Sequence, residues 1–270
     1  MFKNFIKSLI GKLLFTLIFI WIILALIFGF TDLEISKITV DTNSAWGIFG
    51  DKYGGLPGYG LLAIAISVFI GGYNHNIRDQ KIPGYVIIGI GITLLIIGLL
   101  FNIDELIFDG GTISLCLTIF LIFTFNKDWT KYRKISTVVI ALAILNPLLF
   151  IRITKVLCGR VRFYDLTYPS FIEYTPWFLP PGPTSSGRSF PSGHTAMSFM
   201  LLPLLILVKD YEWKDLRKIL LTILVVGWAI FVGLSRVVIG AHYASDVLFS
   251  GMMASIITII LYKKIYFDKK

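Results

Sequence analysis

Long apolar runs, separated by short polar segments, follow one another along almost the whole 270-residue chain. A helix needs about 20 apolar residues to cross the hydrocarbon core of a bilayer, with a range of about 17 to 25. The runs therefore predict membrane-spanning helices, although the second and fourth are short. We expect eight, at residues 9–30, 59–73, 84–101, 112–125, 135–153, 195–208, 219–234 and 247–262.

The composition agrees with a membrane protein. Hydrophobic residues make up 56% of the chain and charged residues 15%, whereas a soluble domain carries about 25% charged residues. The first run is too long for a signal-peptide core and lacks a small-residue cleavage site, so we expect it to stay as a membrane helix. The predicted fold class is an all-α, polytopic transmembrane bundle in which Pro147 kinks the fifth helix. Because the sequence has no internal repeat and no low-complexity linker, we expect residues 1–270 to form one domain.

The net charge of +9 raises the question of nucleic-acid binding. The basic residues are spread over short loops and form no stripe on a soluble face, which argues against that partner. The two cysteines belong to no metal-binding spacing pattern. Cys116 lies inside an apolar run and Cys158 beside basic residues, so we expect no disulfide between them.

The distribution of basic residues also predicts sidedness. If eight helices cross, the two termini and the loops 74–83, 127–134 and 209–218 share one side of the membrane, and they hold 17 of the 25 Lys and Arg residues. Basic residues mark the cytoplasmic side. Both termini are therefore expected in the cytoplasm, and the remaining loops outside it.

Three polar islands stand at the ends of predicted helices on that outer side. The first runs from Lys155 to Arg162, after the fifth helix, and the second covers 189–194, where the sixth begins. The third covers 235–246, between the seventh and eighth helices. Alternating helix ends bring all three islands to one membrane face. Polar residues near membrane depth are usually functional, so we expect a site there.

The islands contain what an anionic phosphate needs. Lys155 offers a compact charge, while Arg162 and Arg236 offer planar forks that suit two oxygens each. The first backbone N–H groups of the sixth helix lack partners and can bind an anion. Gly193 lets the backbone approach closely, and Ser192 can donate its hydroxyl or cap the helix.

The histidines supply the reactive groups. His242 and Asp246 are four residues apart, so in a helix they share a face. A carboxylate on one ring nitrogen fixes the tautomer and leaves the other free to attack phosphorus. His194 is then available as general acid for the leaving alkoxide. The predicted reaction is in-line displacement through a phosphohistidine, with no metal or cofactor, because the cations neutralise the transition state.

Taken together, three signatures resemble those of the type 2 phosphatidic acid phosphatase (PAP2) family, whose active site is related to that of vanadium haloperoxidases. The resemblance covers the chain from Lys155 to its end, and Phe163 stands where the family has proline. The signatures are Lys155-Val-Leu-Cys-Gly-Arg-Val-Arg162, Pro191-Ser192-Gly193-His194 and Ser235-Arg236-Val-Val-Ile-Gly-Ala-His242-Tyr-Ala-Ser-Asp246.

The resemblance implies a membrane lipid phosphatase with residues 135–270 as catalytic core and 1–134 as accessory helices. It implies His242 as nucleophile, Asp246 as its orienting partner and His194 as acid. The residues that it implies as phosphate ligands are Lys155, Arg162, Ser192, Gly193 and Arg236. The expected partners are the bilayer and a lipid phosphate, with a polyprenyl diphosphate or a glycerophospholipid phosphate such as phosphatidic acid or phosphatidylglycerol phosphate ranked ahead of lipid A phosphates.

Two other functions stay open. The same intermediate could pass its phosphoryl group to an acceptor other than water, which would make the chain a lipid-linked phosphotransferase. A transporter is less favoured, because most predicted helices carry no charge in mid-span and no pair of broken helices is present.

The remaining polar residues are less specific. Arg160 and Arg188 flank the islands, and we expect each to contact phosphate or a headgroup or to lie in a solvated loop. His75 is expected on the surface of the opposite side. Residues 163–188 are rich in proline and aromatic residues and form either a lid at the outer interface, where Trp and Tyr are favoured, or a plain connection.

Overall fold

The protein is a bundle of long helices in the computed structural model, which describes residues 9–267 and contains no β-strand in that range. Seven helical stretches there are long and apolar enough to cross a membrane, so the predicted all-α polytopic bundle is confirmed. The short helix α3, Ala45–Tyr53, leads into α4. The long regular helices are α2 (Leu9–Thr39), α4 (Leu56–Gly71), α5 (Ile82–Phe101), α6 (Asp104–Thr124), α10 (Leu216–Val238) and α11 (Ala244–Tyr266).

The fifth crossing changes its winding in the middle. It consists of α7 (Arg133–Ala143), a π-helical segment (Ile144–Ile151) and α8 (Arg152–Cys158). Pro147 lies inside the π-helical segment. Proline has no N–H to donate and its ring collides with the preceding turn, so the irregularity predicted there takes the form of wider turns.

The crossing at the second polar island is shorter. It begins as α9, Gly193–Ser198, and continues as a 3₁₀ helix over Phe199–Val208. A 3₁₀ helix rises about 2.0 Å per residue against about 1.5 Å in an α-helix, which gives the whole segment a length of about 29 Å. That length is close to the roughly 30 Å of the hydrocarbon core. Each of the eight predicted runs therefore has a helical counterpart.

Three helices extend well beyond their predicted ends. The first continues from residue 30 to Thr39, the second crossing includes residues from Ala45 onward rather than from 59, and α6 begins at Asp104 rather than at 112. The apolar pattern is shorter than the helix there because all three extensions carry charged residues. Asp32 in α2 is fully buried, so its charge is satisfied inside the protein and the helix can continue past it.

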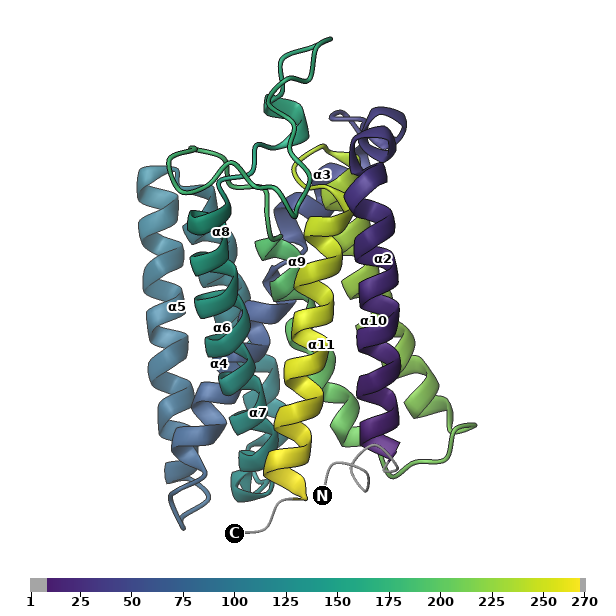
Figure 1. Cartoon of the computed structure of the whole chain (residues 1–270). Helices are drawn as coiled ribbons and strands as arrows, with labels where there is room; N and C mark the ends of the chain where they lie inside the picture. Colours follow the sequence, from purple (N-terminus) through teal and green to yellow (C-terminus); the bar gives the residue numbers. More distant parts are fainter. Residues whose placement is uncertain (1–8, 268–270) are drawn as a thin grey trace.

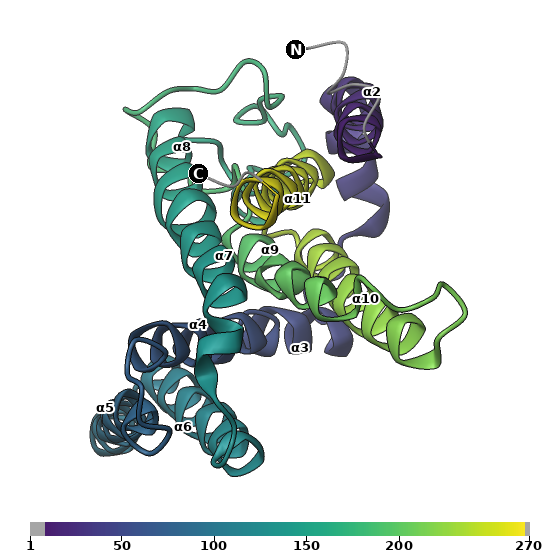
Figure 2. The same ribbon diagram turned by 90° about the horizontal axis from the view of Figure 1, so that it is seen from below.

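The core of the bundle lies between α4, α7, α9 and α11. Buried side chains from these helices pack together, among them Ala65, Leu142, Met197 and Ala254. Helix α2 packs along α11, whereas α5 and α6 pack on each other and on α4. Figure 2 shows α5 and α6 at the margin of the bundle, away from α10 and α11.

The polar islands lie at the opposite end of the bundle from the start of α2 and the end of α11. Helix α2 begins and α11 ends at the lower end of Figure 1. The segment after α8 and the start of α11 lie at the upper end (Figure 1). Because the start of α2 and the end of α11 lie on the same side, the chain between them crosses the bundle an even number of times. Eight crossings, as predicted, satisfy this condition.

Candidate functional site

The three polar islands meet at the upper end of the bundle. The peptide N–H of Ser189 donates to the carbonyl of Arg160 at 2.8 Å, which joins the first island to the second. The N–H of Ser192 donates to the carbonyl of Asp246 at 3.2 Å, which joins the second to the third. Main-chain hydrogen bonds therefore hold together three segments that are far apart in the sequence.

His242 and Asp246 face each other in the buried part of this site. Only 1% of His242 is exposed and none of Asp246. The Nδ1 atom of His242 lies 3.6 Å from Oδ2 of Asp246, just beyond hydrogen-bond length, and no hydrogen bond from residues 9–267 satisfies it. Because the carboxylate faces Nδ1, Nε2 is the ring nitrogen left to react.

The surroundings of His242 favour its neutral form. Burial lowers the pKa of His242 to about 3, and the cations Arg236 and Lys155 act in the same direction. A neutral imidazole keeps a lone pair at pH 7 and can act as a nucleophile. The nearby carboxylate of Asp246 opposes this effect, so it would stabilise a positive charge that develops on the ring during a reaction.

Asp246 is held by several donors. Its Oδ2 accepts the N–H of Tyr243 at 2.9 Å and the hydroxyl of Ser189. Its Oδ1 accepts Nη1 of Arg160 at 2.6 Å. One carboxylate oxygen thus faces His242 while the other is bound to a buried cation.

Arg236 is the predicted phosphate ligand with the clearest spare bonding capacity. It lies in the last turn of α10 and is 4% exposed. Its Nη1 contacts the carboxylate of Asp51 on α3, but not with hydrogen-bond geometry, and within the described part of the chain neither Nε nor Nη1 donates a hydrogen bond. A buried guanidinium with unpaired donors can bind an oxyanion.

Lys155 and Arg162 bring further positive charge to the same place. Lys155 lies in the last turn of α8, within electrostatic range of Arg162 and of both His194 and His242. The guanidinium of Arg162 donates to the hydroxyl of Tyr164. The structure therefore brings both predicted histidines and three predicted cations close enough to interact.

The start of α9 combines a capped helix end with open space. Ser192 is the N-cap, and its hydroxyl oxygen accepts hydrogen bonds from Thr195, from N at 3.4 Å and from Oγ1 at 2.9 Å. Among the described residues, a Cβ added to Gly193 would meet only Cγ2 of Ile151, at 3.9 Å. Packing within the protein does not require glycine there, so a ligand that approaches the backbone is a better reason for it.

The expectation for Arg160 was wrong. The sequence predicts phosphate contact or a solvated loop, but Arg160 is 1% exposed and pairs with Asp246 and with Asp32 on α2. Sequence reasoning also missed Asp32 and Asp51. A charged residue within a membrane helix signals a buried partner, so Asp32 could have been noticed, although not its partner. Arg188 is exposed and donates to carbonyls of its own loop, at 3.3 Å to Ser185 and 2.7 Å to Gly187, in accord with a solvated loop.

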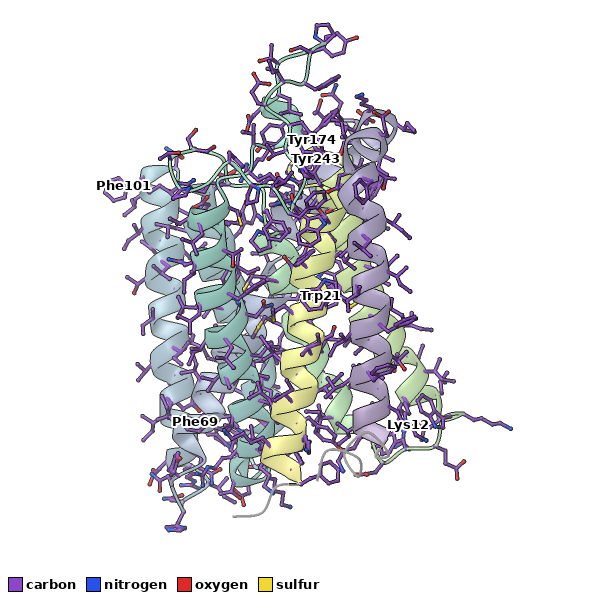
Figure 3. The ribbon with its side chains drawn as sticks, in the orientation of Figure 1. Lys12, Trp21, Phe69, Phe101, Tyr174 and Tyr243 are labelled. Atoms are coloured by element: carbon purple, nitrogen blue, oxygen red, sulfur yellow. The ribbon has the colours of Figure 1, made fainter. Side chains whose placement is uncertain are left out.

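The loop 163–188 is anchored to the bundle on two sides. The indole N–H of Trp177 donates to the carbonyl of Ala25 on α2 at 2.8 Å, and its ring packs on Phe249 of α11. Tyr174 packs edge-on against Tyr243, with ring centroids 5.5 Å apart, at the upper end of the bundle (Figure 3). These contacts tie the loop to the helices that carry Asp32 and Asp246.

These features define a helical membrane protein with a candidate oxyanion site built from histidines, a carboxylate and basic side chains. The PAP2 superfamily model matches residues 137–270, and the chain belongs to this superfamily. The predicted family is thereby confirmed, and the protein is a membrane phosphatase of the PAP2 type. No curated protein and no solved structure matches the chain.

Proposed function

We propose that the protein hydrolyses a phosphate monoester or diphosphate carried by a lipid, through a phosphohistidine on His242 and without a metal ion. The observation that carries the proposal is the pairing of a buried, neutral His242 with Asp246 next to the donors of Arg236 that no described residue accepts. A nucleophile, its orienting carboxylate and a charge-neutralising cation are the parts that this chemistry needs.

Binding begins with charge compensation. Arg236, Lys155 and Arg162 balance the charge of the phosphate, and the backbone at Gly193 approaches it closely. The Ser192 hydroxyl supports the site from the N-cap of α9. These groups are fixed before substrate arrives, so they need little reorganisation as charge develops in the transition state.

The reaction then proceeds in two displacements. Nε2 of His242 forms a bond to phosphorus while the bond to the lipid oxygen breaks, and His194 gives its proton to the departing alkoxide or, for a diphosphate substrate, to the departing phosphate oxygen. Asp246 stabilises the positive imidazole ring. Water next attacks phosphorus, its proton passes to His194, the P–N bond breaks and inorganic phosphate leaves.

A lipid substrate follows from where these residues lie. They stand at one end of membrane-spanning helices, where a phosphate headgroup is present while its chains remain in the bilayer. The excess of basic residues at the opposite end supports placing this site outside the cytoplasm and both termini inside it. Among lipids we rank polyprenyl diphosphates and glycerophospholipid phosphates first, ahead of lipid A phosphates.

Phosphate release from a panel of lipid phosphates tests the proposal. Purified protein in detergent with EDTA should release inorganic phosphate from at least one member, and His242→Ala should abolish release. His75→Ala is the matched control, because His75 is an exposed histidine outside the site. Activity that disappears with EDTA and returns with a divalent cation would contradict the metal-free mechanism, and equal activity of both variants would contradict the role of His242.

A phosphotransferase is the second candidate, and a groove beside the site favours it. The groove has a volume of about 660 Å³ and is lined by Tyr164, Lys37 and Phe171, among others. Tyr164 also bonds to Arg162, so an acceptor hydroxyl in this groove would lie near the phosphate. A lipid alcohol that receives labelled phosphate faster than water does would favour transfer over hydrolysis.

A further inference from the structure

A buried charge network connects the N-terminal helix α2 to the catalytic pair. Asp32 of α2 and Asp246 of α11 are each fully buried, and Arg160 lies between them with 1% of its surface exposed. Nη2 of Arg160 donates to Oδ2 of Asp32 at 3.0 Å, and Nη1 donates to Oδ1 of Asp246 at 2.6 Å. One guanidinium therefore bridges two carboxylates from different helices.

All three nitrogens of the guanidinium donate to protein oxygens. Nε of Arg160 donates to the carbonyl of Thr175 at 2.8 Å, and Nη1 also donates to the hydroxyl of Ser245 at 2.9 Å. Ser245 in turn donates its N–H to Oδ1 of Asp32 at 3.0 Å and its hydroxyl to Oδ2. The guanidinium lies 3.9 Å from the ring centroid of Tyr243. Arg160 is thus committed to partners within the protein, which separates it from Arg236.

The two carboxylates have different consequences for His242. Arg160 alone would neutralise Asp246 and weaken its attraction for a positive imidazole. Asp32 binds the other terminal nitrogen of the guanidinium and brings a second negative charge. The side chains of Arg160, Asp32 and Asp246 together therefore have a formal charge of −1. Oδ2 of Asp246 then stays directed toward His242, 3.6 Å from Nδ1.

We propose that Asp32 is a positioning residue that acts through Arg160 to hold Asp246, and with it His242, in the orientation needed for attack on phosphorus. The proposal rests on the proposed function of His242. The hydrogen bonds of Asp32 to described residues go to Arg160 and Ser245 and not to His242. Asp32 also lies outside the residues that match the superfamily model, 137–270. The N-terminal helix thus contributes to the chemistry of a site formed by the C-terminal half.

The first test separates turnover from substrate binding. Asp32→Asn keeps the shape of the side chain but removes its charge, and we expect kcat to fall about 10- to 100-fold, as for losses of groups that orient a ligand, with KM unchanged. Glu34→Gln is the matched control, a carboxylate on the same helix that is 65% exposed and pairs only with Lys37 among residues 9–267. It should behave like the wild type.

The second test needs no lipid. Nε2 of His242 can become the fifth ligand of the vanadium in orthovanadate, so the affinity for orthovanadate depends on the orientation of His242. The affinity for inorganic phosphate depends mainly on the cations of the site. Asp32→Asn should weaken orthovanadate binding about tenfold or more, by the same orienting effect, and leave phosphate binding unchanged. Equal weakening of both ligands, or of neither, would overturn the proposal.

Two further outcomes keep the conclusions separate. If Asp32→Asn does not fold, Ser245→Ala removes a hydroxyl that bridges Asp32 and Arg160 without removing a charge, and the same selective loss of vanadate binding is expected. Wild-type binding of both ligands by that variant would overturn the proposal. If wild-type protein cleaves no lipid phosphate but the vanadate effect is present, the proposed function fails and the positioning role stands.

Discussion

Replacing Asp246 by Asn tests the central electrostatic contact of the site. The amide has nearly the size of the carboxylate but carries no charge, and the nearest carboxylate oxygen lies 3.6 Å from Nδ1 of His242. At an effective dielectric constant of about 20, unit charges at that distance interact by about 4.6 kcal/mol. Since about 1.4 kcal/mol corresponds to a factor of ten, full loss of this attraction would slow the reaction by roughly a thousandfold.

The expected loss is somewhat smaller, because the imidazole carries only part of a positive charge when the P–N bond is half formed. We expect kcat of Asp246→Asn to fall between about 100- and 1,000-fold, with most of the loss in formation of the phosphohistidine. Rapid-quench single turnovers with labelled lipid phosphate measure that step directly. A phosphohistidine is recognised because acid cleaves it and base does not.

Stability must be measured alongside the rate. The Asp246→Asn substitution would leave Arg160 with Asp32 as its remaining carboxylate, so the buried guanidinium keeps one charged partner. We therefore expect a loss of about 1 to 3 kcal/mol in the free energy of unfolding, rather than the larger cost of an unpaired buried charge. Asp41→Asn, at an exposed carboxylate at the same end of the bundle, is the control. A folded Asp246→Asn protein that forms phosphohistidine within about tenfold of the wild-type rate would refute the electrostatic reasoning.

Three other perturbations follow from the structure. Gly193→Ala should leave thermal stability unchanged, because among the described residues its Cβ meets only one atom, at 3.9 Å. The same substitution should raise KM, and a lower melting temperature would contradict the first expectation. Since burial lowers the pKa of His242 to about 3 and an unfolded histidine titrates near 6.5, the unfolded state binds more protons between these values. Stability should therefore fall as pH drops from about 6.5 toward 3, with a flatter dependence in His242→Asn. Trp177→Ala should cost about 1 to 3 kcal/mol of stability through lost burial and the lost bond to Ala25, whereas Trp213→Ala, at a position 85% exposed, should cost nothing measurable by thermal denaturation.

The helices were predictable from the sequence because bilayer thickness sets a length that apolar runs must reach. The ends were less predictable wherever a polar residue lies inside a helix. Residues 31–39 look like a loop from their composition, yet α2 continues through them because Asp32 finds a partner in the fold. Hydropathy describes the preference of a side chain for water or lipid, and it carries no information on a buried partner such as Arg160.

The contacts within the site were also predictable only in part. The spacing of His242 and Asp246 predicts that they share one face of a helix. Their side chains do face each other at 3.6 Å, but His242 lies just before α11, whose N-cap is Tyr243. Arg160 is separated by 128 residues from Asp32 and by 86 from Asp246, so no local pattern could reveal that it bridges them. Its neighbours Lys155 and Arg162 have no such buried carboxylate partner among the described residues and stay predicted phosphate ligands, and charge alone did not distinguish the three.

The bridge also changes how the two halves of the chain should be viewed. Helix α2 belongs to the predicted accessory region 1–134, but it supplies the carboxylate of Asp32 to Arg160 and the carbonyl of Ala25 to Trp177. Both partners belong to the C-terminal half, and both bonds reach residues that are buried or half-buried. Without α2, the buried Arg160 would lose one of its two carboxylates, and the loop 163–188 would lose its hydrogen bond to Ala25. A helix outside the region that matches the superfamily is therefore part of the structural support of the proposed chemistry.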